Sequence, residues 1–139
     1  MPCLSGQYNP AIGLLINVGV LPPGTVTPTG IGNAQLTAFP ALMDTGASNT
    51  CISPAVIQTL KLAPIGKLPM ISATHTIPAN QYLVDIALLF GPGALFVPNI
   101  QVGEFTAVPQ SPFQILVGRD IICRGSLALS FDGHFTFSL

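Results

Sequence analysis

The feature that most constrains this chain is the segment at residues 41–51, Ala-Leu-Met-Asp-Thr-Gly-Ala-Ser-Asn-Thr-Cys. Asp44 is the first charged residue of the sequence, and it directly follows an apolar run. A carboxylate in such a setting must be solvated, paired or protonated to escape the cost of desolvation. Thr45 adds a short hydroxyl, and Gly46 leaves room for another backbone or a ligand. The segment predicts a crowded turn that presents one carboxyl group, although Asp and Gly are also common in ordinary surface turns.

A second segment, Ile-Leu-Val-Gly-Arg-Asp at residues 115–120, is an apolar triplet stopped by glycine and followed by a charged pair. In this order the two segments resemble those of the retropepsin-like (retroviral-type) aspartic proteases. In that family an Asp-Thr/Ser-Gly-Ala loop carries the catalytic carboxylate. A later Gly-Arg-Asp/Asn segment supports that loop and leads into a helix. The resemblance spans the chain from about residue 13 to the C-terminus.

The resemblance implies a role for each residue of the first segment. Asp44 would be the catalytic carboxylate, and Thr45 would supply a hydroxyl that bonds across a twofold axis. Gly46 would lie close to the substrate backbone, and Ala47 would complete the active-site loop.

The second segment would support this loop from below through Gly118, Arg119 and Asp120. One departure from the family concerns Arg119. Retroviral relatives pair the matching arginine with a carboxylate four residues after the catalytic Asp, whereas this chain has Ser48 there. Arg119 therefore needs another partner, such as a backbone carbonyl.

The Asp-Thr-Gly triplet occurs once in 139 residues. Aspartic proteolysis needs two carboxyl groups that share one proton, because one acts as a base on water while the other protonates the scissile carbonyl. The resemblance therefore implies an aspartic endopeptidase that is a homodimer, with one Asp44 from each chain across a twofold axis. Terminal strands near residues 1–8 and 135–139 would contribute to the interface, as termini do in the family. The substrate would be a peptide or a protein.

Composition fits a single domain over residues 1–139 with its own core. Charged residues make up 6% of the chain, hydrophobic residues 49%, and the mean hydropathy is +0.64. Some apolar surface is therefore expected to be covered by another subunit. A net charge of −1 offers no basic surface for nucleic acid. No apolar stretch reaches the ~20 uninterrupted residues of a membrane span.

The three cysteines, Cys3, Cys51 and Cys123, are widely spaced and form no metal-binding pattern. An odd count of this kind predicts reduced thiols in a cytoplasmic compartment, with release from a longer precursor left open. His75 and His134 lie far apart in the sequence, so neither a metal site nor a cofactor is predicted.

Hydrophobic periodicity predicts a mainly β chain with one or two short helices. Ser53 followed by Pro54 predicts a helix start. The predicted strands cover residues 13–21, 33–43, 50–52, 70–76, 81–90, 94–102, 105–108 and 113–118, the predicted helices cover 54–60 and 119–124, and a closing hairpin covers 126–139 with its turn at Asp132-Gly133. The resemblance implies that these elements form a single-lobe acid-protease barrel. A helix at 54–60, frequent in bacterial and other cellular relatives and usually lacking in retroviral ones, favours that branch.

The strands at 70–76 and 81–90 predict a hairpin that turns near residues 77–80 or slightly earlier. It occupies the position of the family's flap, a mobile hairpin that closes over bound peptide, and Thr74, His75 and Thr76 are its candidate tip residues. Viral flaps are rich in glycine, whereas no glycine occurs between Gly66 and Gly91. A stiffer or differently built cover is the expected consequence. For His75 the favoured interpretation is a solvated polar side chain on a hairpin rather than a functional tip residue.

Two other functions stay open at this point. The fold could serve binding or regulation without catalysis, in which case Asp44 would be dispensable. Alternatively, the chain could be an unrelated β-rich interaction domain in which residues 44–46 form only a turn.

Overall fold

The computed structural model describes residues 3–71 and 74–139. Strands dominate it, with two short helices between them. The elements are β1 (Cys3–Gln7), β2 (Leu15–Leu21), β3 (Thr37–Met43), β4 (Cys51–Ile52), α1 (Pro54–Leu60), β5 (Gly66–Ile71), β6 (Thr76–Phe90), β7 (Gly93–Glu104), β8 (Ile115–Val117), α2 (Arg119–Ile122), β9 (Ser126–Leu129) and β10 (His134–Ser138). The predicted mainly β class with two short helices is confirmed.

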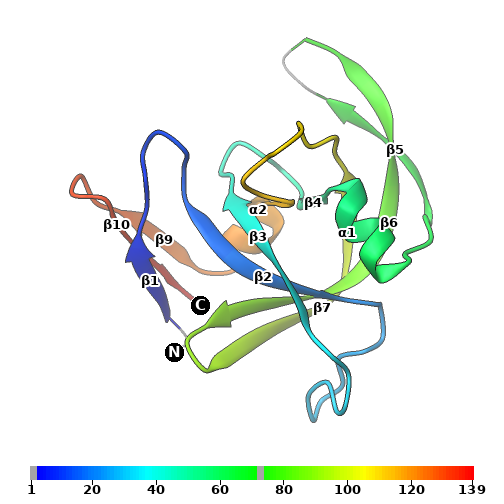
Figure 1. Ribbon diagram of the computed structural model, residues 1–139, viewed down its shortest axis with the longest axis horizontal. Coiled ribbons are helices and arrows are strands. Elements are labelled where there is room, and N and C mark those ends of the chain that lie inside the picture. Colours follow the sequence, from blue (N-terminus) through cyan, green and yellow to red (C-terminus); the bar gives the residue numbers. More distant parts are fainter. Residues whose placement is uncertain (1–2, 72–73) are drawn as a thin grey trace.

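Six strands close into a barrel in the order β2-β3-β8-β4-β7-β6, and a further pairing of β2 with β6 completes the ring. The β3–β8 and β4–β7 pairings are parallel, whereas the other pairings of the ring are antiparallel. Strand β5 pairs only with the first part of β6, so the β5–β6 hairpin projects from the barrel (Figure 1). Closure removes free edges from the six barrel strands and leaves β5 as an outer strand.

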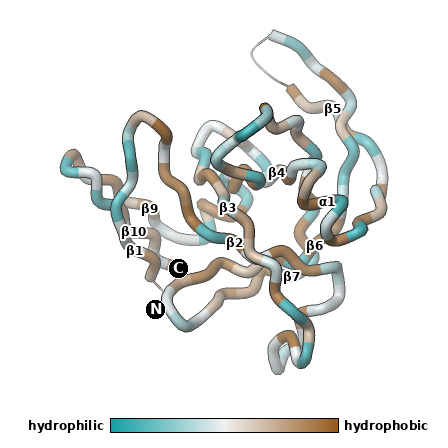
Figure 2. Tube along the Cα trace, viewed as in Figure 1, coloured by the Kyte–Doolittle hydropathy of each residue, from teal (hydrophilic) through white to brown (hydrophobic). Residues whose placement is uncertain are grey.

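The barrel interior is filled by aliphatic side chains that the strands contribute from every side. Figure 2 shows the hydrophobic stretches along β2, β6 and β7. Fully buried examples are Val18, Val20, Ile52, Val84, Ile86, Val102, Ile115 and Val117. Burial of each such side chain stabilises the fold by about 1.5–3 kcal/mol.

A second sheet, in the order β1-β10-β9, packs beside the barrel (Figure 1). Strands β9 and β10 form the predicted closing hairpin, and Gly133 has the positive φ of 86° that its turn requires. Phe135 and Phe137 of β10 are buried in the core and attach this sheet to the barrel. Strand β1 pairs along the whole of β10, so the first and last strands of the chain lie side by side in one sheet.

The β5–β6 hairpin turns earlier than residues 77–80, which lie inside β6 opposite residues 67–70. Residues 72–73, part of the predicted strand 70–76, lie outside the described residues. Pro78 suggested a turn, but it directly faces Pro69 across the two strands. Two residues that cannot donate hydrogen bonds are tolerated opposite each other where the ladder requires no bond between them. Strand β5 also begins at Gly66, before the start at residue 70 that was predicted for this strand.

Three other predicted elements differ from the structure. Residues 105–108 form no strand, because the chain leaves the sheet after the Phe105 N–H bonds to the Ile52 carbonyl (3.0 Å). Helix α2 ends at Ile122 rather than at residue 124. Ser53 precedes α1 as predicted, but its hydroxyl donates to Gln114 Oε1 (2.6 Å) and does not cap the helix.

No helix within the described ranges is long and apolar enough to cross a membrane.

Asp85 is a fully buried carboxylate within β6, at an irregularity in the pairing with β7. Its Oδ2 accepts from the Val26 N–H (2.8 Å), and its Oδ1 accepts from the Asn99 N–H (2.8 Å). The carboxylate thus fixes the loop after β2 and the distorted part of β7, where Asn99 has a φ of 53°. Bonds of this kind compensate a buried charge for its lost hydration.

Replacing Asp85 with Ala is expected to lower the free energy of unfolding by about 2–4 kcal/mol, because two backbone donors lose their acceptor. Asp85→Asn keeps one acceptor oxygen and should cost less. Urea unfolding of the three proteins provides the measurement. Equal stability of the Ala variant and wild type would show that water replaces the carboxylate without cost.

Candidate active site

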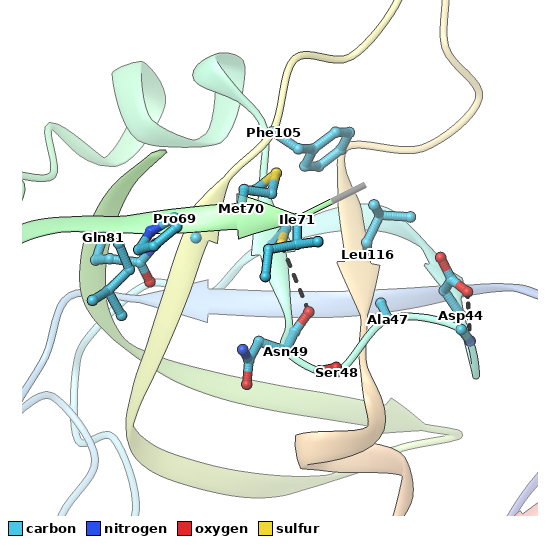
Figure 3. Close-up of a pocket in the computed structure, with 14 residues that line it drawn as sticks. Asp44, Ala47, Ser48, Asn49, Pro69, Met70, Ile71, Gln81, Phe105 and Leu116 are labelled. Carbon is cyan, nitrogen blue, oxygen red and sulfur yellow. Dashed lines mark hydrogen bonds between the residues drawn. The ribbon is translucent and has the colours of Figure 1, made fainter. Parts of the chain in front are cut away.

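Asp44 directly follows β3, whose last residues pair with β8. Its backbone N–H donates to the Val117 carbonyl (2.9 Å), so the residue stays attached to the barrel although its side chain is half-buried. Asp44 Oδ1 accepts a hydrogen bond from the Gly46 N–H (2.9 Å), drawn in Figure 3. One carboxylate oxygen is therefore oriented by the turn, and the other is not engaged within the described part of the chain.

The loop from Asp44 to Thr50 is held from below by the segment between β8 and α2. Thr50 is fully buried, and its hydroxyl donates to Asp120 Oδ1 (2.7 Å) while accepting from the Gly118 N–H (3.1 Å). The Thr50 N–H donates to Asp120 Oδ2 (2.9 Å). Both oxygens of Asp120 thus bind one residue, which fixes the end of the loop.

Two backbone bonds extend this contact along the loop. The Arg119 N–H donates to the Ala47 carbonyl (2.9 Å), and the Asp120 N–H donates to the Ser48 carbonyl (3.2 Å). The three residues that were predicted to support the loop, Gly118, Arg119 and Asp120, therefore all touch it.

Arg119 binds the loop without a carboxylate partner. Its Nη1 donates to the Thr45 carbonyl (2.8 Å), and its Nη2 donates to the Ser48 hydroxyl (3.0 Å). The absence of a carboxylate at position 48 predicted a partner such as a backbone carbonyl, and the structure contains one. The guanidinium is exposed, so we expect the contact to position the loop more than to stabilise the fold.

A cavity of about 520 Å³ opens beside Asp44. Its lining comes from four regions that are distant in sequence: the Asp44 loop with β4, strand β5, the paired strands β6 and β7 up to Phe105, and strand β8. The lining residues are Asp44, Gly46, Ala47, Ser48, Asn49, Cys51, Leu68, Pro69, Met70, Ile71, Gln81, Gly103, Phe105 and Leu116. Figure 3 shows Phe105, Met70 and Leu116 on one side of this space and Ala47 and Asn49 on the other. The volume lies within the range of small-molecule and peptide sites.

The β5–β6 hairpin covers this cavity through β5 and not through its predicted tip. Thr74, His75 and Thr76 are exposed and do not line the cavity in the described part of the chain. Residues 68–71 of β5 line it instead, and Gln81 of β6 contributes from the opposite strand.

Asp44 is the one Asp, Glu, Lys or Arg among the described residues that line the cavity, and Ser48, Asn49 and Gln81 add uncharged polar groups to a mainly apolar lining. Burial raises the pKa of the Cys51 thiol, and the carboxylates of Asp120 and Asp44 raise it further against the opposing effect of a backbone bond at Gly103. Cys51 is therefore a neutral thiol at physiological pH. Among residues 3–71 and 74–139, no group of three or more His, Cys, Asp or Glu side chains could hold a metal ion.

Several residues of the site had no usable signal in the sequence. Thr50 was assigned only to a short strand, although a hydroxyl six residues after Asp44 proves to be the partner of Asp120. Gln81, Gly103 and Phe105 reach the cavity because β6 and β7 pair across it, with Gln81 directly opposite Gly103. Such a contact forms only when strands that are distant in sequence pair, so no short sequence pattern predicts it.

Gly118 has no room for a side chain. An added methyl carbon would lie 2.5 Å from the Asn49 carbonyl carbon and 2.7 Å from its oxygen, both of them backbone atoms. Gly118→Ala must therefore displace the loop, and we expect it to lower the free energy of unfolding by about 1–3 kcal/mol. Urea unfolding and hydrogen exchange of residues 44–50 measure the effect.

The matched control is Gly66→Ala, whose methyl group would meet no heavy atom within 4 Å. It should leave the exchange of residues 44–50 unchanged. Equal effects of the two substitutions would contradict a close approach at Gly118.

No protein-family model and no curated protein matches this sequence. Among solved structures, the chain is similar to a retropepsin-like aspartic protease from Rickettsia conorii, with a TM-score of 0.61 and 16% identity over 98% of this chain and 89% of that one. A weaker similarity is to the retroviral protease-like domain of Ddi1 from Leishmania major, with a TM-score of 0.43 and 11% identity over 85% of this chain and 82% of that one. The closed six-stranded barrel and the first of these similarities show that the chain has a retropepsin-like fold.

Proposed function

We propose that the protein is an aspartic endopeptidase whose active form is a homodimer. The observation that carries this proposal is the half-buried Asp44 carboxyl group, oriented by its own turn beside a mainly apolar cavity that contains no other charged residue among its described lining residues. Two such carboxyl groups brought into contact would share one proton, because two like charges repel each other strongly where water is partly excluded, and a pair of this kind is suited to acid–base chemistry.

The requirement for two chains follows from the chemistry. A single carboxyl group cannot both remove a proton from water and protonate the peptide carbonyl at the same moment. The chain has one Asp-Thr-Gly triplet, so a second copy must supply the second Asp44. Thr45 supports this arrangement, because it is exposed and its hydroxyl has no hydrogen-bond partner within the described residues. In a dimer that hydroxyl would bond to the partner's loop.

The cavity suits an extended peptide. Strand β5 is the outer strand of its sheet and lines the cavity, so its backbone groups can pair with a substrate strand. The side chains around it, Leu68, Met70, Phe105 and Leu116, offer apolar contacts. Cleavage would need no cofactor, since the two carboxyl groups activate water themselves.

Asp44→Asn is expected to lower the rate of peptide cleavage by about 10²–10⁴-fold, since an amide cannot act as a base, while the fold is retained. Wild-type activity should trace a bell against pH, because the reaction needs a pair that holds one proton. The measurement is cleavage of a peptide library between acid and neutral pH. Cleavage by Asp44→Asn at the wild-type rate would exclude the mechanism, and peptide binding without cleavage by wild type would favour the non-catalytic binding role.

Mixing the two proteins tests the need for two carboxyl groups. Excess Asp44→Asn should suppress wild-type activity at a fixed wild-type concentration, because mixed dimers contain one Asp44. An equal excess of serum albumin is the control. Activity that is unaffected by the variant would contradict a shared site.

Cys51 provides a reporter for occupancy of the cavity. Because its pKa is raised, it has less thiolate at neutral pH than an ordinary thiol, and its reaction with iodoacetamide should be slower than that of the exposed Cys123 and accelerate only at higher pH. A peptide mimic with a hydroxyl in place of the scissile carbonyl should slow the reaction at Cys51 and not at Cys123. Peptide mapping by mass spectrometry measures both. Equal labelling of Cys51 with and without a bound mimic would place the peptide elsewhere.

A further inference from the structure

Gly103 of β7 lines the cavity beside Asp44, and its backbone does not require a glycine. The residue belongs to a regular ladder, in which it lies opposite Gln81 of β6 and Cys51 of β4. Its φ lies outside the left-handed region in which glycine is favoured. What glycine provides at this position is therefore the space of the missing side chain.

The atoms nearest to that space are the ends of side chains. A methyl carbon added to Gly103 would lie 3.3 Å from Gln81 Nε2, 3.5 Å from Cys51 Sγ and 3.6 Å from Met70 Cε. None of these atoms belongs to the backbone, in contrast to the atoms that crowd Gly118. The three side chains also line the cavity, so a group that enters from the cavity can move them aside and reach Gly103.

Two neighbours orient the amide of Gln81. Its Nε2 donates to the Ala79 carbonyl (3.3 Å), and its Oε1 accepts from Gln101 Nε2 (3.4 Å). An amide nitrogen carries two hydrogens, so one N–H is left without an acceptor among the described residues. A purely apolar group over Gly103 would separate this N–H from water and leave it unpaired, whereas a group with an oxygen at its tip would accept from it.

The other side chains around this space favour an aromatic ring. The thioether of Met70 is suited to contact with a ring edge, and the thiol of Cys51 is small and neutral. Phe105 lies on the same side of the cavity as Met70 (Figure 3). Its ring stacks on that of Phe113, with centroids 6.2 Å apart, which holds it in place. An aromatic group bound here would therefore meet sulfur and a second ring.

We propose that the space over Gly103 is a subsite for one aromatic side chain of the substrate, tyrosine in preference to phenylalanine, and that Gly103 determines this specificity. The inference rests on the proposed function, because it assigns one residue of the peptide to a part of the same cavity. Figure 3 shows Gln81 and Asp44 at opposite ends of the space. The selected residue therefore lies at a fixed distance from the scissile bond and not at the bond itself.

Cleavage of a proteome-derived peptide library, with the products identified by mass spectrometry, tests the specificity. Wild type should select tyrosine, and more weakly phenylalanine, at one position relative to the cleaved bond. Gly103→Val should change this preference to small residues at that position alone, because the branched side chain fills the space. For a tyrosine peptide kcat/KM should fall by about 10–200-fold, mainly through a higher KM, as when a methylene is added to an apolar pocket.

Gly66→Val is the matched control. Gly66 lies opposite Gln81 in the neighbouring strand β5, and a methyl carbon added there would meet no heavy atom within 4 Å. Because Gly66 is not among the described lining residues, this variant should keep the wild-type preference.

Two further variants separate size from hydrogen bonding. Gly103→Ala adds only one methyl group among movable side-chain ends, so it should fold and weaken the tyrosine preference by a smaller factor than Gly103→Val. Gln81→Leu removes the free N–H and should make phenylalanine preferred over tyrosine, with no change toward small residues.

Binding of p-cresol, the side chain of tyrosine, gives a readout that needs no cleavage. In an NMR titration of wild type it should shift the Gly103 backbone amide and the Gln81 side-chain amide, with a dissociation constant of about 1–20 mM for so small a ligand. Folded Gly103→Val should show no saturable shift.

A wild-type cleavage preference that persists in both Gly103 variants, or an aliphatic residue selected at that position, would overturn the subsite and leave the endopeptidase intact. Wild type that shows no p-cresol shift at Gly103 would also overturn the subsite. Wild type that binds p-cresol there but cleaves no peptide would overturn the endopeptidase and leave an aromatic binding site.

Discussion

The candidate site depends on one interaction, the hydrogen bonds by which the half-buried Asp120 carboxylate holds the buried residue Thr50. Both carboxylate oxygens bind this residue, one through its hydroxyl and the other through its backbone N–H. The same hydroxyl accepts from Gly118, so the end of the loop, the end of β8 and the start of α2 meet at one side chain. An interaction of this kind resists removal of either partner, because the remaining group would be left buried without a bond.

The loop that these hydrogen bonds support has no hydrophobic core of its own. From Thr45 to Asn49 the residues are exposed or half-buried, and they bury no large side chain. Arg119 holds the loop through the Thr45 carbonyl and the Ser48 hydroxyl, a neutral partner where retroviral relatives use a carboxylate. Both partners of the guanidinium are neutral, one a carbonyl and the other a hydroxyl. Geometry, and not charge neutralisation, is what the arginine contributes.

The parts of the structure that could be predicted from sequence are those in which local chemistry has one outcome. The loop at Asp44, the helix α1 after Ser53 and the hairpin turn at Gly133 follow from short patterns, whereas the support at Gly118–Asp120 was expected only from the family resemblance. The turn of the β5–β6 hairpin, predicted near residues 77–80 or slightly earlier, could be located only approximately, because a proline indicates a turn unless another proline faces it across the ladder. The cavity lining, with Gln81 opposite Gly103, and the buried carboxylate of Asp85 arise only when distant strands pair.

Pro69 and Pro78, which face each other in the β5–β6 hairpin, affect how readily this hairpin can pair with strands of other molecules. Each lacks the backbone donor that a strand from another molecule would need at that point. A continuous intermolecular sheet therefore cannot pass through these two positions, although Ile71 and Ile77 are exposed and the other backbone groups of β5 can still pair with a short peptide. The two prolines thus limit strand pairing between copies of the chain at this hairpin. The few charged residues of the chain provide little electrostatic repulsion against such pairing.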